Sequence, residues 1–114
     1  MVIHIPRSSQ REIEDFPADV RGDLADALAR LEQGHSLSMP LSRPMTGIGP
    51  GVHELRLSDR SGACRVVYAL VVRGTVHVLH SFKKTTRSTP RRDIDIARRR
   101  FGDLRERLKE ERQR

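Results

Sequence analysis

Residues 64–72 form an almost uninterrupted apolar run, and this run constrains the fold more than any other feature of the chain. A strand with one face in water alternates polar and apolar residues, so the run predicts a central strand that is buried on both faces. Turn-forming residues stand on both sides of it, at 59–62 and at Arg73 and Gly74. We therefore expect an antiparallel meander of three strands, over residues 52–57, 64–72 and 75–84.

Helical patterns precede this meander. Ser9 followed by Glu12 forms a capping-box pattern, which predicts a short helix through residue 15. A second helix is expected after Pro17, where apolar residues recur along one face until Gly34 ends the pattern. Residues 8–33 are therefore expected to form an αα-hairpin, whereas the Gly- and Pro-rich residues 34–51 predict a loop.

A third helix is expected near the C-terminus. Thr89 fits the N-cap and Pro90 the first helical position, and apolar residues between 94 and 108 recur on one helical seam. With a short strand over residues 2–5, the expected order is β, α, α, β, β, β, α. This order predicts an α+β fold in which an N-terminal helical hairpin packs on a small antiparallel sheet, with a basic C-terminal helix.

Length and composition restrict the class of protein. A chain of 114 residues fits one domain over its whole length. The longest fully apolar stretch, residues 66–72, is far too short to span a membrane, and the first residues lack the pattern of a signal peptide. We therefore expect a soluble, cytoplasmic protein. The single cysteine, Cys64, excludes an internal disulfide framework and a cysteine-cluster zinc site.

The excess positive charge is confined to the end of the chain. Residues 1–82 contain nine arginines and nine acidic residues, whereas residues 83–114 contain thirteen Lys or Arg and six acids. The whole net charge of +7 therefore lies in the last 32 residues. Such a segment suits a polyanion such as a nucleic acid; the alternative is a solvated basic helix that aids solubility.

Several kinds of catalytic site find no support in the sequence. The five histidines are scattered and have no metal-binding spacing, so neither a metal nor a cofactor is expected. No Gly-x-Ser-x-Gly nucleophile motif occurs, and Gly47 and Gly49 lack the spacing and the following Lys of a phosphate loop.

The basic residues near the strand ends are better placed for chemistry. In an antiparallel meander the end of one strand returns beside the start of the next, so Arg56, Arg65 and Lys83 are expected to converge at one sheet edge. Three cations there would form a phosphate cradle; alternatively, they are strand-end charges kept in water. Tyr68 also has two interpretations, as a core residue or as a stacking or proton-transfer group.

Four motifs follow one another along the chain: Val-His-Glu-Leu-Arg at 52–56, Arg-Val-Val-Tyr at 65–68, His-Ser-Phe-Lys-Lys-Thr at 80–85, and Thr-Pro-Arg-Arg-Asp-Ile-Asp-Ile-Ala-Arg at 89–98. In this order they resemble the phage-derived, HigB-like branch of the RelE/ParE toxin superfamily, over nearly the whole chain. The resemblance implies the toxin of a type II toxin–antitoxin pair. Many such toxins are endoribonucleases that cut mRNA in the ribosomal A site, and a helix-turn-helix antitoxin neutralises them.

The resemblance also implies a metal-independent reaction, in which the RNA 2′-OH attacks the adjacent phosphate while the protein orients it and stabilises the charge. The residues implied in catalysis all lie in the expected strands: Arg56, Arg65, Lys83, Lys84, Tyr68 and Glu54. The cations would stabilise phosphate charge, with Lys84 as the second choice after Lys83, and a lysine with a lowered pKa is also a candidate base. The carboxylate and the phenol would transfer protons or position the substrate.

Contacts to RNA are implied for other residues. His53 stands where relatives often have an aromatic residue, and it would stack on a base or titrate near neutrality. Arg87, Arg91 and Arg92 would bind RNA, and the C-terminal helix would meet ribosomal RNA.

The end of the chain departs from the family pattern. Residues 106–114 lack the His or Tyr that some relatives use in catalysis, so acid–base chemistry would come from within the sheet, or activity would be weak. Two alternatives stay open. One is a toxin of the related branch that inhibits DNA gyrase, and the other is a non-enzymatic basic protein that acts only through its antitoxin complex.

Overall fold

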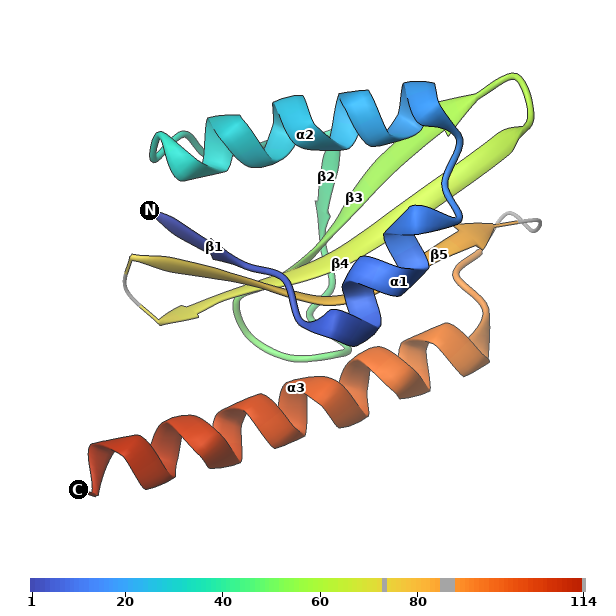
Figure 1. Cartoon of the computed structure of the whole chain (residues 1–114). Helices are drawn as coiled ribbons and strands as arrows, with labels where there is room; N and C mark the ends of the chain where they lie inside the picture. The colour runs from blue at the N-terminus through green and yellow to red at the C-terminus, as the bar shows by residue number, and fades with distance from the viewer. Residues whose placement is uncertain (73, 85–87, 114) are drawn as a thin grey trace.

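The computed structural model describes residues 1–72, 74–84 and 88–113. Its element order is β1 (Val2–His4), α1 (Arg7–Glu14), α2 (Ala18–Glu32), β2 (Ser42–Pro44), β3 (Val52–Asp59), β4 (Gly62–Val72), β5 (Thr75–Lys84) and α3 (Arg91–Arg112). The strands form one sheet in the order β1-β5-β4-β3-β2, with α2 along one face and α3 along the other (Figure 1). The expected α+β fold, with its helical hairpin and C-terminal helix, is confirmed.

The sheet is mixed rather than antiparallel throughout. β3, β4 and β5 form the expected meander, but β1 pairs with β5 in parallel, with Val2 opposite Thr75. The helical hairpin lies between β1 and the meander, and parallel neighbours need a crossover of this kind. The first predicted turn shortens to residues 60–61, because β3 extends to Asp59 and β4 begins at Gly62. Arg73 of the second predicted turn lies outside the described residues.

β4 contributes to two separate cores, as its apolar sequence predicts. One core packs α2 on the sheet and includes Val66 and Tyr68, and the other packs α3 on the sheet and includes Val67 and Ala69. These four residues are at most 1% exposed. Alternate residues of a strand point to opposite faces, so β4 is the buried centre of a three-layer structure.

The predicted capping box of the first helix does not form. α1 begins at Arg7 with Pro6 as the preceding cap residue, and no side chain caps the helix. Ser9 is buried inside α1 rather than placed at its start. Glu12 reaches β5 instead of the helix end, where it finds stronger, charged partners.

The start of the last helix also differs from the prediction. Pro90 is the cap residue rather than the first helical residue, α3 begins at Arg91, and no side chain caps the helix. The Thr89 hydroxyl, expected to cap α3, donates a hydrogen bond to Glu54 of the sheet. A hydrogen bond to a carboxylate is stronger than one between neutral groups, so the Thr89 hydroxyl pairs with Glu54 rather than with the exposed amides at the start of α3.

The glycines and prolines of residues 34–51 predicted a loop, but this region also contains the short strand β2. β2 pairs antiparallel with β3, so that Arg43 lies opposite Glu54. The following segment folds over α3, and a Cβ added at Gly49 would lie 2.1 Å from the Phe101 ring. Gly49 is therefore required for close packing of the loop against α3.

Gly49→Ala is expected to destabilise the fold by about 1–3 kcal/mol, because the new methyl group has to displace the Phe101 ring. Gly47→Ala is the matched control, since a Cβ at that position meets nothing within 4 Å. Urea unfolding of the two variants measures the difference in stability. Equal unfolding midpoints would contradict the packing described for Gly49.

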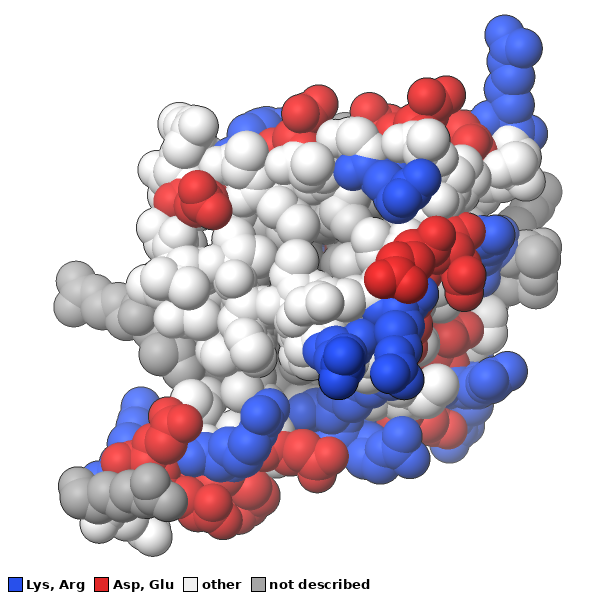
Figure 2. Space-filling model, viewed as in Figure 1, with Lys and Arg blue, Asp and Glu red and all other residues white. Residues whose placement is uncertain are grey.

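The charges on α3 are mixed rather than uniformly basic. Residues 91–112 carry nine Lys or Arg and six acidic residues. Figure 2 shows basic and acidic side chains interspersed along the edge of the molecule where α3 runs. Within the described ranges, no helix has the length and apolar character needed to cross a membrane. A concentrated positive site therefore has to be sought on the sheet.

Candidate functional site

Basic side chains from four neighbouring strands come together on the sheet face that carries α3. Arg56 lies directly opposite Arg65, and Arg43 lies opposite Glu54, two residues before Arg56 on β3. Lys84 is on the same face of β5. Residues opposite each other in a ladder share a face, as do residues two apart in one strand. These residues form the cationic cluster, which consists of Arg43, Arg56, Arg65 and Lys84.

Lys83 does not belong to this cluster, contrary to the prediction. It lies opposite Cys64, which is part of the core under α2, so the Lys83 side chain is on the other face of the sheet. The β4–β5 ladder is displaced by one residue at Tyr68 and Ala69 only, and the register on either side of them is the same, with Val72 opposite Thr75 and Cys64 opposite Lys83. Alternate residues of a strand point to opposite faces, so Lys84 rather than Lys83 shares the face of Arg65.

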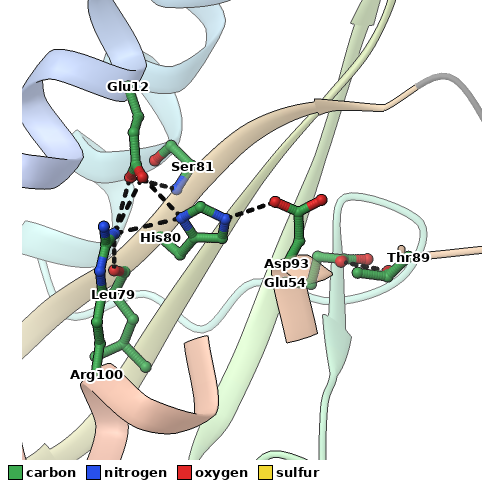
Figure 3. Close-up of polar contacts among 8 residues, drawn as sticks. All are labelled: Glu12, Glu54, Leu79, His80, Ser81, Thr89, Asp93 and Arg100. Carbon is green, nitrogen blue, oxygen red and sulfur yellow. Dashed lines mark hydrogen bonds and ion pairs between the residues drawn. The ribbon is translucent and has the colours of Figure 1, made fainter. Parts of the chain in front are cut away.

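A buried ion pair forms the floor of the cationic cluster. Arg65 Nε lies 3.7 Å from Glu54 Oε1, and the two side chains are 9% and 1% exposed. Arg65 Nη1 donates to the carbonyl oxygens of Leu57 and Cys64 at 3.2 and 3.0 Å. The Thr89 hydroxyl donates to Glu54 Oε2 at 2.8 Å (Figure 3). These contacts hold the guanidinium in one orientation beneath the more accessible cations.

The crowding of positive charge alters ionisation within the cluster. Burial lowers the pKa of Lys84, and the positive charge of Arg65 lowers it further. The negative charge of Glu54 raises this pKa, whereas the charges of Arg56 and Arg43 lower it. Burial also lowers the pKa of Arg65, against the opposing charge of Glu54. A bound anion would relieve the repulsion among these cations, so the arrangement suits a phosphate group.

Tyr68 and His53 lie on the opposite face, away from the cluster. The Tyr68 hydroxyl is 2.6 Å from Ser42 Oγ within the core under α2, and Tyr68 is 1% exposed. Burial raises the pKa of Tyr68. The His53 ring stacks on Tyr68 with centroids 5.4 Å apart, and burial lowers the pKa of His53. Tyr68 is thus a core residue, and its burial is not compatible with the predicted role in proton transfer.

Two of the three arginines expected to contact RNA lie near the cluster. Arg91 and Arg92 are exposed in the first turn of α3. Thr89, just before this turn, bonds to Glu54, so α3 begins beside the floor of the cluster. Arg87 lies outside the described residues.

A second group of charged side chains, which the sequence did not predict, adjoins the Glu54–Arg65 ion pair and Thr89 (Figure 3). His80 of β5 lies between two carboxylates: its Nδ1 is 2.9 Å from Glu12 Oε2, and its Nε2 is 2.7 Å from Asp93 Oδ1. Arg100 Nη1 donates to both Glu12 oxygens, at 3.0 and 3.1 Å. The Ser81 amide donates to Glu12 Oε1 at 3.1 Å. The network therefore joins α1, β5 and α3 through charge-assisted hydrogen bonds.

The residues missed by the sequence analysis share one property, which is that their partners are distant in the chain. Glu12 and Arg100 are 88 positions apart, and Glu12 fits a local capping pattern equally well. Arg43 lies in a region whose composition predicts a loop, and Thr89 fits a helix cap. His80 is the one candidate signal, but it is not specific, because His77 stands in the same strand and its buried ring nitrogens have no hydrogen-bond partner among the described residues.

Glu12 links the stability of the fold to pH. Burial raises the pKa of Glu12, but the hydrogen bonds from His80, Arg100 and Ser81 outweigh burial and hold it below the ordinary value of 4.5. The folded state therefore favours the ionised carboxylate. The resulting stabilisation is complete above the ordinary pKa and is lost as the pH falls through the lower pKa of the folded state.

Glu12→Gln is accordingly expected to reduce the loss of unfolding free energy between about pH 5 and pH 3, because the amide does not titrate. Glu14→Gln, at an exposed position of the same helix, serves as the control. Urea unfolding at a series of pH values measures both variants. A pH dependence unchanged by Glu12→Gln would show that this carboxylate is not held by the network.

Glu54→Ala is expected to destabilise the fold by about 3–5 kcal/mol, because it leaves the buried Arg65 charge without its partner. Glu54→Gln should cost less, since its amide oxygen still accepts the Thr89 hydrogen bond. Thermal and urea unfolding provide the comparison, with Arg56→Ala as a half-exposed control in the same strand. If Glu54→Ala were no less stable than Arg56→Ala, the Glu54–Arg65 pair would not be the buried support of the cluster.

The cationic cluster can bind an anion through its own positively charged side chains. Its guanidinium and ammonium groups present N–H donors on one part of the sheet, and the ion pair with Glu54 fixes the orientation of Arg65. In the part of the chain that the structure describes, no group of three or more His, Cys, Asp or Glu side chains is arranged to hold a metal ion.

Comparisons with known proteins identify similar sequences and folds. A family model described as phage derived protein Gp49-like matches residues 11–102. No curated protein matches the chain.

Three similar solved structures contain the E. coli toxin RelE. The intact RelBE toxin–antitoxin complex has 17% identity and a TM-score of 0.57, and the match covers 75% of this chain and 98% of the other. A RelE mutant in the free state has 18% identity and a TM-score of 0.56, with 72% and 81% covered. The isolated toxin has 19% identity and a TM-score of 0.54, with 75% and 85% covered. At these identities the likeness establishes the fold.

Proposed function

Because the chain belongs to the phage-derived Gp49-like family and has the fold of the RelE toxin, we propose that it is the toxin of a type II toxin–antitoxin pair and cuts mRNA on the ribosome. The observation that carries this proposal is the cationic cluster, in which four strands present positive side chains on one sheet face. Such a patch is suited to the phosphates of an RNA backbone.

The proposed reaction uses the 2′-hydroxyl of the RNA itself. Its oxygen attacks the adjacent phosphorus, the bond from phosphorus to the 5′-oxygen breaks, and the products carry a 2′,3′-cyclic phosphate and a 5′-hydroxyl. One proton leaves the 2′-hydroxyl, and another is gained by the departing 5′-oxygen. Negative charge accumulates on the phosphorane, and cations that fit this state better than the ground state accelerate the reaction.

The accessible members of the cluster are assigned to the phosphate. Arg56 and Lys84 are half-buried cations above the floor, and Arg43 is exposed on β2, where it suits a neighbouring phosphate. Arg65 and Glu54 would position the site from beneath. The lowered pKa of Lys84 also favours its amine as a group that accepts a proton.

The proposed partners are an antitoxin, the message and the ribosome. One of the similar structures is a toxin–antitoxin complex, which supports a cognate antitoxin, expected to be of the helix-turn-helix class. An acidic segment of the antitoxin laid over the cationic cluster would block RNA binding. Arg91 and Arg92, exposed at the start of α3, are proposed to contact RNA in the ribosomal A site, in the cytoplasm.

Neighbouring lysines provide a matched test of the site. Lys84→Ala removes a cation from the cluster, whereas Lys83→Ala removes the same side chain from the opposite face. Both variants and the parent chain are tested in a reconstituted translation reaction with a defined message, and primer extension maps the cut sites. We expect Lys84→Ala to lower the cleavage rate by about 10²-fold or more and Lys83→Ala to leave it nearly unchanged.

Each outcome of this experiment has a definite meaning. Cleavage that requires ribosomes and is lost with Lys84→Ala alone supports the proposal. Loss with Lys83→Ala alone would move the site to the other face of the sheet. An intact message in every lane would contradict the endoribonuclease, and a supercoiling assay with DNA gyrase would then separate a gyrase inhibitor from a non-enzymatic protein.

A further inference from the structure

The start of α3 is fastened to the sheet on two strands. The Thr89 hydroxyl donates to Glu54 Oε2 at 2.8 Å, and Asp93 Oδ1 lies 2.7 Å from His80 Nε2. Glu54 is on β3 and His80 is on β5, and β4, which carries Arg65, lies between them in the sheet. The first turn of α3 therefore spans the strand that bears the buried guanidinium.

His80 is fixed on its other side as well. Its Nδ1 faces Glu12 of α1 at 2.9 Å, so each ring nitrogen lies within hydrogen-bond distance of a carboxylate. Arg100 holds Glu12 in place and also donates to the Leu79 carbonyl at 2.9 Å. The His80 side chain is 5% exposed, so it is closed to any substrate and acts only through the groups that it holds.

We propose that His80 is a positioning residue for the cationic cluster, acting through Asp93 and Thr89 on the Glu54–Arg65 pair. This inference rests on the proposed function, because that function makes the orientation of Arg65 matter for the rate. Glu54 has one oxygen toward Arg65 and the other bonded to Thr89. When the start of α3 shifts, Glu54 loses the Thr89 bond and is free to turn away from Arg65.

A merely stabilising role for His80 makes a different prediction. In that case, removal of its contact with α3 would lower the unfolding free energy, but the folded fraction would keep its full rate. The positioning role requires that the folded protein itself become slower. It also requires that the environment of Arg65 change, although Arg65 lies opposite Phe82 rather than His80 in the ladder.

Four single variants, and the double variant of Asp93→Ala with Thr89→Val, separate these roles. Asp93→Ala removes the contact with His80, and Asp93→Asn keeps an oxygen that accepts the His80 hydrogen bond. Thr89→Val removes the hydroxyl that bonds to Glu54 without a large change in side-chain volume. Glu106→Ala, at a 71% exposed side chain of the same helix, is the control for loss of an acid from α3.

Three measurements are made on each full-length variant. Urea unfolding gives the stability. Cleavage on programmed ribosomes gives kcat and KM at a temperature where every variant is folded. The NMR signal of the Arg65 Nε–H group reports the environment of that guanidinium without any reaction.

We expect Asp93→Ala and Thr89→Val each to lower kcat by about tenfold, with KM within about twofold, because alignment rather than binding is lost. Both should shift the Arg65 signal, and the double variant should be no slower than the worse single one, since both act on one turn. Asp93→Asn should restore most of kcat, and Glu106→Ala should behave as the parent chain.

An unmoved Arg65 signal in Asp93→Ala would overturn the positioning role, and so would an unchanged kcat in an active protein. If the parent chain cuts no message, the proposed function fails. The Arg65 signal then still decides whether His80 positions the Glu54–Arg65 pair, so the two failures are distinguishable.

Discussion

The apolar central strand β4 has to be covered on both faces, and the other elements are arranged around that requirement. Val66 and Tyr68 need a layer on one side, which α2 supplies, and Val67 and Ala69 need a layer on the other, which α3 supplies. Burial of this kind is the main favourable contribution to folding. Because α3 has to lie across the sheet to cover β4, its first turn is brought to the polar end of the same strand.

Arg65 is a charged residue within the otherwise apolar β4, and its burial accounts for the ion pair and the hydrogen bonds that surround it. An arginine residue that is 7% exposed is tolerated only when its charge is paired and hydrogen-bonded. Glu54 provides the charge, and Thr89 satisfies the second oxygen of that carboxylate. His80 then fixes the same turn through Asp93. The need to satisfy one buried cation thus places the start of α3 beside the cationic cluster.

The sequence was sufficient for the features that depend on local periodicity. The second and third helices follow from apolar spacing, the meander follows from its strand pattern and turn residues, and the two buried faces of β4 follow from its continuous run. The first helix was expected from a capping box that does not form. The face of the sheet on which each lysine lies was predicted wrongly. Lys83 lies opposite Cys64 and Lys84 opposite Ala63, so Lys84 rather than Lys83 shares a face with Arg65. The two irregularities of the β4–β5 ladder cancel, so this pairing also follows from Val72 opposite Thr75, and the error lay in the face assigned to Lys83.

Polar side chains with two possible partners were the other source of error. Glu12 and Thr89 both fit helix caps in the sequence, yet both bond to groups in or near the sheet. Tyr68 had a core interpretation and a functional one, and the hydrogen bond to Ser42 in the core decides between them. In each case the buried partner lies more than twenty positions away in the chain, where sequence spacing carries no information.

RNA phosphate is proposed to bind on the α3 face of the sheet, at the cationic cluster. The most direct measurement is an NMR titration of the labelled chain with a short RNA whose 2′-hydroxyls are methylated, so that it binds without being cut. The signals of Arg43, Arg56 and Lys84 should shift together as the RNA is added, and these shifts should diminish at high salt. Shifts confined to the opposite face, around His53 and Lys83, with the cluster unmoved, would contradict this proposal.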